Sequence, residues 1–261
     1  MGKLLLQGIF KQSKYEGEKE LLEDSETLSL TEEVKKFLRS RGADLVGIAS
    51  PDRLLNAPSN HKPEDFLPDV KSLISIGLRL NASVIKGLPK TRREYRMVYD
   101  VVNFRLNSLA YDVSCLLESK GYKAIPFPAS RPYDEKKIFG DISHKHVAVA
   151  AGLGKFGLNN LILTPDYGPY VRFTTVITNA PLKPDPLFPG DICKWKECLE
   201  CVKICPVHAL ENPRYDPIKG WRIDKEKCQH YLWVVLSNTG EVCGLCIKAC
   251  PIGAKLKNIL Q

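Results

Sequence analysis

Two short cysteine-rich runs constrain this chain more than any other feature of its sequence. The first is CKWKECLECVKICP, residues 193–206, and the second is CGLCIKACP, residues 243–251. A further cysteine, Cys228, lies between them, so eight of the nine cysteines occur in the last third of the chain. Each run ends in C-x2-C-x3-C-P, which is close to the ligand loop of a [4Fe-4S] cluster. The pattern therefore predicts a segment that folds around iron–sulfur clusters.

The two runs are expected to share their ligands. In proteins with two such clusters, the cysteine before the proline ligates the cluster that the other loop mainly holds. Each cluster takes four thiolates, so the eight cysteines serve two clusters with none left over. Set one is then Cys193, Cys198, Cys201 and Cys250, and set two is Cys205, Cys228, Cys243 and Cys246. Cys193 departs most from the usual loop, because four residues rather than two separate it from Cys198.

Zinc and disulfides are the alternative uses for so many cysteines. Zinc sites usually pair C-x2-C with a second C-x2-C or with histidines, and the repeated C-x3-C-P differs from that pattern. Disulfides need an oxidising compartment. The apolar run near the start, within residues 1–14, is too short for a signal peptide or a membrane helix. We therefore expect a cytoplasmic protein without a membrane segment, where thiols stay reduced.

The net charge of the chain is basic. It contains 38 Lys and Arg residues against 30 Asp and Glu residues, a formal net charge of +8. Such an excess is typical of proteins that bind nucleic acid. Two oxidised clusters with their thiolates contribute about −4, so the loaded protein carries about +4. Part of the excess thus balances the clusters, and a basic groove for nucleic acid stays an open alternative.

The rest of the chain alternates between helical and strand patterns. Thr31 is the expected N-cap of a first helix that ends near Gly42, and a long helix is expected over residues 94–120, with Gly121 at its end. Its expected apolar face is Val101, Phe104, Leu106, Leu109, Val113 and Leu116, with Cys115 as a buried small hydrophobe. Strands are expected over residues 44–50, 72–80, 123–130, 158–164 and 170–179, with the second alternating and the third at a sheet edge. Residues 183–191 are the expected linker into the cysteine-rich segment.

A glycine-rich turn lies between an expected helix, residues 144–151, and the later strands. Gly152, Gly154 and Gly157 match the dinucleotide fingerprint G-x-G-x-x-G, and glycine lets the backbone approach a ligand closely. The fingerprint requires a strand before the turn and a helix after it, and here the order is reversed. The turn therefore favours a ligand other than a dinucleotide.

Two features of the chain resemble those of a known family. They are residues 143–168, SHKHVAVAAGLGKFGLNNLILTPDYG, and the lone cysteine between two cysteine runs. The family that they resemble is the epoxyqueuosine reductase family, which is related to the reductive dehalogenases. The resemblance covers roughly residues 30–255. It implies an α+β fold in two domains. Residues 1–185 would form a nitroreductase-like, cobalamin-binding core, and residues 186–261 a ferredoxin-like module with two [4Fe-4S] clusters.

The same resemblance implies a function and a site. The function is a cobalamin-dependent iron–sulfur reductase that passes electrons through two [4Fe-4S] clusters to a corrinoid, which reduces an organic substrate. The implied proton donor is an acid upstream of the glycine turn, with Asp141 the nearest candidate and Tyr133 and Asp134 behind it. The implied corrinoid contacts are Ser143, His144, Gly152, Leu153, Gly154, Lys155, Phe156, Gly157 and Asn159.

Several points about partners stay open at this stage. An external electron donor such as a ferredoxin or flavodoxin is expected, with a small molecule or a modified nucleoside as substrate. The family usually carries a helical-repeat extension that contributes to tRNA binding, and this sequence ends eleven residues after Cys250, so tRNA stays an alternative. A corrinoid-reducing or electron-transfer protein without its own substrate is another. None of the five histidines lies in a D-x-H-x-x-G motif, so we expect cobalamin without an axial histidine.

Overall fold

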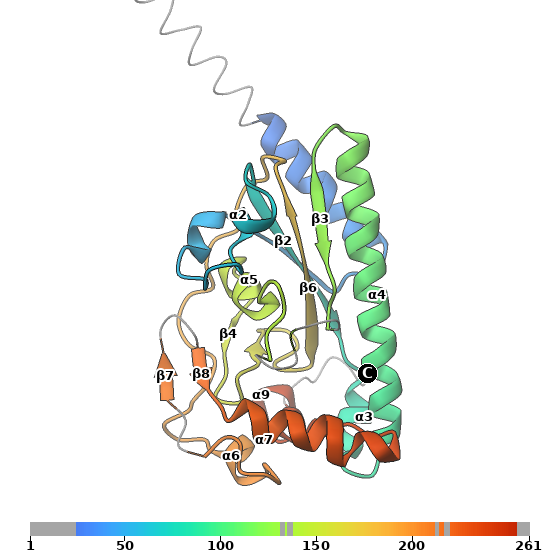
Figure 1. Ribbon diagram of the computed structural model, residues 1–261, viewed down its shortest axis with the longest axis vertical. Helices are drawn as coiled ribbons and strands as arrows, with labels where there is room; N and C mark the ends of the chain where they lie inside the picture. Colours follow the sequence, from blue (N-terminus) through green and yellow to red (C-terminus); the bar gives the residue numbers. More distant parts are fainter. Residues whose placement is uncertain (1–24, 131–133, 135–137, 212–213, 217–219, 255–261) are drawn as a thin grey trace, which may run out of the picture.

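A computed structural model of the 261-residue chain describes residues 25–130, 134, 138–211, 214–216 and 220–254 (Figure 1). Its centre is a four-stranded antiparallel sheet in the order β1-β2-β6-β3. The strands are β1 (Leu45–Ala49), β2 (Ser72–Arg79), β6 (Val171–Thr178) and β3 (Ala124–Phe127). β3 lies at the sheet edge and contains Pro126, as expected of a strand with a residue that lacks an N–H.

Helices cover both faces of this sheet. Ile74 and Ile76 of β2 pack in the same cluster as α4 (Arg92–Ser119), whereas Leu73 packs in the cluster that contains Val147 of α5 (His144–Ala150). Successive residues of a strand point to opposite faces, so α4 and α5 lie on opposite sides (Figure 1). All of β2 except Arg79 is therefore buried, and the expected alternation of polar and apolar residues is wrong because neither face of the strand meets solvent.

The long helix α4 is close to its expected bounds, and Gly121 follows it with a φ of +85°, the left-handed conformation of a helix terminator. Its expected apolar face is partly wrong. Val101 and Phe104 are exposed, because the helix buries a face rotated away from them. The buried side chains are Tyr95, Val102, Asn103, Leu106, Leu109, Ala110, Val113, Ser114 and Leu117. Cys115, expected to be buried, is also exposed.

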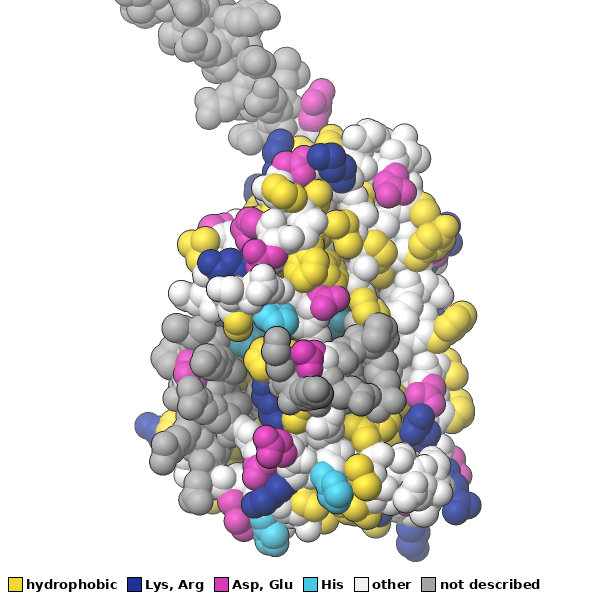
Figure 2. Space-filling model, in the orientation of Figure 1, with side chains coloured by type: hydrophobic (Ala, Val, Ile, Leu, Met, Phe, Trp, Pro, Cys, Tyr) yellow, Lys and Arg dark blue, Asp and Glu magenta, His cyan; other side chains and the backbone are white. Residues whose placement is uncertain are grey.

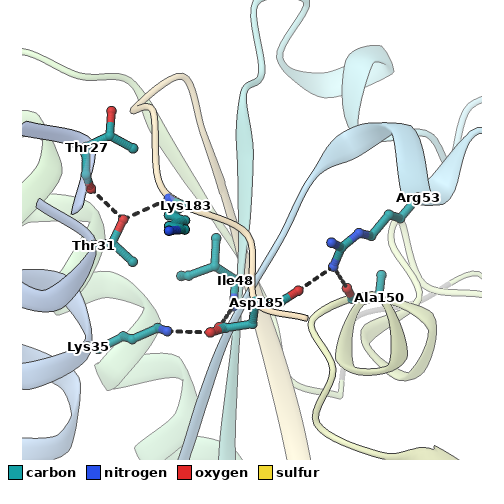
Figure 3. Close-up of polar contacts among 8 residues, drawn as sticks. All are labelled: Thr27, Thr31, Lys35, Ile48, Arg53, Ala150, Lys183 and Asp185. Atoms are coloured by element: carbon teal, nitrogen blue, oxygen red, sulfur yellow. Dashed lines mark hydrogen bonds and ion pairs between the residues drawn. The ribbon is translucent and has the colours of Figure 1, made fainter. Parts of the chain in front are cut away.

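The first helix corrects another expectation. It is described over residues 25–40, so Thr31 lies inside it and does not cap its start. The Thr31 hydroxyl donates to the Thr27 carbonyl at 2.7 Å and accepts a hydrogen bond from the Lys183 N–H at 2.8 Å (Figure 3). A hydroxyl directed along its own helix also serves a distant backbone group here, which local sequence does not reveal.

The remaining elements are short. They are η1 (Pro51–Leu54), α2 (Pro63–Phe66), α3 (Ala82–Gly87), β4 (Lys155–Phe156), β5 (Ile162–Leu163), α6 (Glu200–Lys203), β7 (Arg214–Asp216), β8 (Gly220–Arg222), α7 (Lys225–His230), η2 (Tyr231–Val235), η3 (Ser237–Thr239), α8 (Leu245–Lys248) and α9 (Pro251–Ala254). The strand expected over residues 158–164 is reduced to β5, which pairs with β4. Among the described residues, no helix has the length and apolar character needed to span a membrane.

The linker over residues 183–191 has no helix or strand and is held by polar contacts. The Asp185 carboxylate pairs with the Lys35 ammonium at 2.6 Å and accepts the Ile48 N–H at 2.7 Å. The Arg53 guanidinium donates to the carbonyls of Asp185 and Ala150, both at 2.7 Å (Figure 3). These contacts join the first helix, β1, η1 and α5 at one point, and so fix where the chain leaves the sheet for the cysteine-rich segment.

We predict that Asp185→Asn lowers the free energy of unfolding by about 1–3 kcal/mol, because a partly buried Lys35 loses its charged partner. Denaturant unfolding of the parent and the variant measures the difference. Glu33→Gln removes the exposed ion pair with Lys120 and should change stability by less than about 0.5 kcal/mol. Equal changes in the free energy of unfolding would show that the Asp185–Lys35 ion pair contributes no more than an exposed ion pair does.

Candidate iron–sulfur and cofactor site

The structure brings the four cysteines of set one together. Burial, followed by the negative charges of Cys193, Cys250 and Cys198, raises the pKa of the Cys201 thiol to about 12. Burial first, and then Cys193 and Cys198, likewise raise the pKa of Cys250. Each thiol therefore lies within electrostatic reach of the others, although Cys250 is separated from the rest by about fifty residues of sequence.

The four cysteines of set two also lie close to one another. The pKa of Cys228 is raised to about 11, by burial first and then by Cys243 and Cys205. The pKa of Cys246 is raised well above its ordinary value, again by burial and then by Cys243 and Cys228. The last cysteine of each run thus lies with the cysteines of the other run, which is the crossed arrangement expected from the sequence. That these thiols ligate clusters stays a prediction.

The surroundings of the thiols suit iron–sulfur clusters. Four adjacent buried thiols do not all ionise unless cationic iron balances their charge. Backbone N–H groups point at sulfur, from Leu158 to Cys193 at 3.4 Å and from Ala209 to Cys205 at 3.3 Å, as around cluster ligands. The buried Tyr170 hydroxyl, which lies near Cys250, has no hydrogen-bond partner among the described residues. Within the same residues, no three His, Cys, Asp or Glu side chains converge on a single-ion site.

A cavity of about 1330 Å³ lies beside the thiols. Its walls come from α5 and β6 on one side and from the cysteine-rich segment, including α7 and η2, on the other. Cys193 of set one and Cys228 of set two both line it. The volume exceeds the roughly 300–1,000 Å³ of ordinary small-molecule pockets, so the cavity is large enough for an extended cofactor.

His144 lines the cavity with both ring nitrogens engaged. Because a carbonyl only accepts, Nε2–H donates to the Pro128 carbonyl at 2.9 Å. Nδ1 then accepts from the Thr175 hydroxyl at 2.9 Å in the neutral ring. Burial is the main reason that the pKa of His144 is lowered to about 4. Neither nitrogen is free to bind a metal in this conformation.

Near His144, the side chains of Lys145, His146 and Phe156 form a cationic and aromatic part of the cavity wall. Burial, and then the charge of Lys225, lower the pKa of Lys145 to about 8, and its ammonium donates to the Asn160 carbonyl at 3.0 Å. The His146 ring lies 4.9 Å from the Phe156 ring, and its Nδ1 is 2.7 Å from the Ser143 hydroxyl. Ser143, His144, Lys155 and Phe156, all expected corrinoid contacts, line the cavity.

The other expected corrinoid contacts do not line the cavity. They are Gly152, Leu153, Gly154, Gly157 and Asn159. A side chain at Gly152 would meet the Pro186 carbonyl, and one at Gly154 the Leu163 carbonyl, so these glycines permit close backbone packing. The Asn159 amide donates to the Cys246 carbonyl at 3.2 Å and so ties the turn to the second cysteine run.

The expected proton donors are placed differently. Asp141 is exposed in the cavity lining, and its backbone carbonyl lies 3.1 Å from His61 Nδ1. Asp134 is also exposed, and its backbone forms an isolated bridge with Phe139. Tyr133 lies outside the described residues.

Tyr99 is a further residue near the cavity, and no pattern in the sequence marks it as part of a site. Its hydroxyl lies 2.7 Å from the hydroxyl of Ser130, a cavity residue, and the Arg172 guanidinium stands 4.0 Å above its ring. Burial acts to raise the pKa of Tyr99, but the Arg172 charge and hydrogen bonds with Ser130 and Asn103 outweigh it, so the pKa lies below its ordinary value. Such a phenol suits proton transfer. No spacing in the sequence pairs α4 with β6 in this way.

The His144 environment predicts a pH dependence. The unfolded ring takes up a proton below about pH 6.5, whereas the folded ring does so near pH 4, so His144 lowers stability progressively between these values. The contribution approaches about 3 kcal/mol at pH 4. His144→Gln retains a donor for Pro128, and its stability deficit at pH 7 should shrink by that amount toward pH 4 in denaturant unfolding. A deficit that is constant with pH would contradict the assignment.

Comparison with known proteins gives the site a context. Residues 193–254 match the family model described as a 4Fe-4S dicluster domain, a range that contains every cysteine of both sets. This match assigns iron–sulfur clusters to the cysteine-rich segment.

Curated relatives extend the similarity beyond that segment. An epoxyqueuosine reductase of Bacillus subtilis (strain 168) is 30% identical in an alignment 210 positions long, gaps included, which covers 70% of this chain and 52% of the relative. A tetrachloroethene reductive dehalogenase of Sulfurospirillum multivorans is 26% identical in an alignment 268 positions long, gaps included, which covers 87% of this chain and 51% of the relative. The chain therefore spans about half the length of the curated relatives it matches.

Solved structures share the fold. A reductive dehalogenase whose structure suggests a mechanism for B12-dependent dehalogenation aligns with a TM-score of 0.66 at 21% identity, covering 84% of this chain and 31% of that one. At this identity the likeness concerns the fold alone, a mixed helix-and-sheet core joined to the iron–sulfur segment. The solved structure thus agrees in fold, and the curated relatives show that the chain belongs to an epoxyqueuosine reductase-like family related to the reductive dehalogenases.

Proposed function

We propose that the chain is a cobalamin-dependent iron–sulfur reductase that passes electrons through two [4Fe-4S] clusters to a corrinoid, which reduces an organic substrate. The cavity carries this proposal, because one cysteine of each set lies in the same lining as α5 and β6. The iron–sulfur clusters, as electron donors, would thus lie directly beside a large ligand bound in the cavity. In domain terms, residues 1–185 are a nitroreductase-like, cobalamin-binding core, and residues 186–261 hold the clusters.

The cavity has the size and chemistry for a corrinoid. Its volume of about 1330 Å³ suits a ligand larger than ordinary substrates. When bound, the cofactor supplies low-potential reduction chemistry, and the protein supplies binding, orientation and electrostatics. Since both ring nitrogens of His144 are engaged, the structure also supports a corrinoid without that axial histidine.

The charges of the lining favour a ligand with negative groups. Five cationic side chains line the cavity against two acidic ones. The cations are Arg53, Lys145, Lys155, Arg172 and Lys225, and the acids are Asp141 and Asp191. Phe156, Leu161 and Trp233 add apolar surface that excludes water from the wall. A cofactor phosphate or an anionic substrate group fits this balance.

Two side chains are candidates for proton delivery. Asp141 stands in the lining, where a bound cofactor would remove water from its carboxyl group and favour the protonated form. Tyr99 reaches the cavity through the Ser130 hydroxyl, and its neighbour Arg172 stabilises the phenolate that remains after proton transfer. We assign the role of proton donor to Asp141, and Tyr99 is the second candidate for that role.

The alternative function is a corrinoid-reducing or electron-transfer protein without its own substrate. The reductase is favoured because the cavity contains candidate proton donors, which electron transfer alone does not require. The proposal also includes an external electron donor, such as a ferredoxin or flavodoxin, and a reducing compartment such as the cytoplasm. The substrate is a small molecule or a modified nucleoside, and salt-sensitive binding of tRNA would indicate a nucleic-acid substrate.

Iron analysis tests the two-cluster part of the proposal. We expect about eight irons and eight sulfides per anaerobically purified chain. Cys205→Ala should impair the cluster of set two although Cys205 belongs to the first run, because the crossed arrangement places it beside Cys228 and Cys243. Cys115→Ala, at the exposed cysteine outside both sets, should leave the iron content unchanged. Four irons or stoichiometric zinc in the parent would sink the proposal of two clusters.

Substitution of Asp141 separates the reductase from the alternative. Asp141→Asn should retain cluster content and cobalamin binding but lose most substrate turnover, because the amide has no acidic proton. Asp166→Asn, an exposed substitution outside the cavity lining, is the matched control. Undiminished turnover in Asp141→Asn would pass the role to Tyr99, which Tyr99→Phe then tests. Absence of turnover in the parent with every substrate class would favour the electron-transfer alternative.

A further inference from the structure

Helix α4 carries a second apolar face on the side opposite its buried one. Its exposed members recur at alternating spacings of four and three residues, which is the heptad pattern of a coiled coil. They are Met97, Val101, Phe104, Ser108, Tyr111 and Cys115, called here the outer stripe. At 100° per residue these six positions lie within about 80° of arc, directly opposite the buried Leu106.

The outer stripe is open to solvent in the part of the chain that the structure describes. The exposed fractions are 58% for Met97, 47% for Val101, 72% for Phe104 and 64% for Tyr111. Figure 2 shows hydrophobic side chains along the edge of the molecule where α4 runs in Figure 1. Single exposed apolar residues are ordinary on protein surfaces, but a regular series along one helix is the signature of an interface.

The polar member of the stripe does not interrupt it. The Ser108 hydroxyl donates to the Phe104 carbonyl of its own helix at 3.1 Å. Its hydrogen-bonding capacity is therefore met inside the helix, and a partner can cover it without leaving an unpaired donor. The outer stripe therefore extends without interruption along 19 positions of the helix, from residue 97 to residue 115.

We propose that a second copy of this chain covers the outer stripe, with the two α4 helices paired as a parallel, two-stranded coiled coil. The charges beside the stripe argue for this occupant and direction. In heptad terms Asp100, which pairs with Arg96 of its own helix at 2.8 Å, is at position g, and Arg105 is at position e, so in a parallel pair each Asp100 also faces Arg105 of the second copy. Two-fold symmetry makes this ion pair twice.

The antiparallel direction is less favourable. In an antiparallel pair position g flanks position g and position e flanks position e, so Asp100 at g no longer faces Arg105 at e and the ion pair is lost. The core positions also suit the parallel pair. Val101, a β-branched residue, is at position a, where such residues favour two-stranded coils, and Phe104 and Tyr111 at position d supply large apolar area. The parallel arrangement places Cys115 of the two copies face to face.

The first test is the oligomeric state of the anaerobic holoprotein by sedimentation velocity over a range of concentrations. We expect a dimer whose dissociation constant rises roughly tenfold or more in Phe104→Glu, because a charge replaces a central apolar contact. Leu55→Glu, at a leucine that is 64% exposed away from α4, should leave the constant unchanged. Iron content, measured on each variant, shows that the fold and clusters are retained.

The second test determines the direction of the helices. A short bis-maleimide should cross-link the two Cys115 thiols of a parallel dimer and give no product in Cys115→Ser. In the antiparallel dimer these thiols are separated by about 27 Å along the helices, beyond a short reagent. Asp100→Arg should weaken the dimer, and adding Arg105→Asp should restore it. A monomeric parent, with the stripe bare or covered by residues outside the described ranges or by another protein, overturns the proposal. A dimer that does not cross-link overturns the parallel arrangement.

Discussion

Thiols from distant parts of the chain must meet in two groups of four, and much of the structure is arranged around that requirement. Cys250 lies with Cys193 and Cys198, and Cys205 lies with Cys228, so each run contributes a thiol to the group that the other run mainly forms. Backbone and side-chain hydrogen bonds then fasten the paired runs to the turn after α5, from Leu158 to Cys193 and from Asn159 to Cys246. The glycines of that turn matter because they allow this approach.

Placement of the cysteine-rich segment creates the cavity. The Asp185 contacts with Lys35 and Ile48 hold the start of the linker against the sheet, and the segment then returns to face α5 and β6. His144 and Lys145, at the start of α5, are half-buried where the two parts meet, and the loss of water around them lowers the pKa of both. Closing the cavity therefore favours the neutral form of the His144 imidazole and makes the Lys145 ammonium lose its proton more readily. Because the pKa of Lys145 is lowered to about 8, the charge of this wall changes with pH just above neutrality, whereas His144 stays neutral there.

Local patterns in the sequence predicted much of this architecture. The strands, the bounds of α4, the edge position of β3 and the grouping of the cysteines all depend on short-range periodicity or on motif spacing. The failures share a cause, because each involves packing between distant segments. Thr31 serves Lys183, which lies 152 positions away in the sequence, and the buried face of α4 is decided by the sheet that it covers. Tyr99 and Arg172 meet across α4 and β6, and neither residue carries a local signal of the other.

The proposed reductase requires a corrinoid in the cavity, next to the clusters. The most direct test is anaerobic titration of the cluster-loaded protein with cob(II)alamin, followed by electron paramagnetic resonance. We expect saturable, stoichiometric binding and a base-off signal without nitrogen splitting, unchanged in His146→Ala, because no ring nitrogen of this chain should ligate the cobalt. Absence of binding, or a nitrogen splitting that disappears when His144 or His146 is replaced, would contradict it.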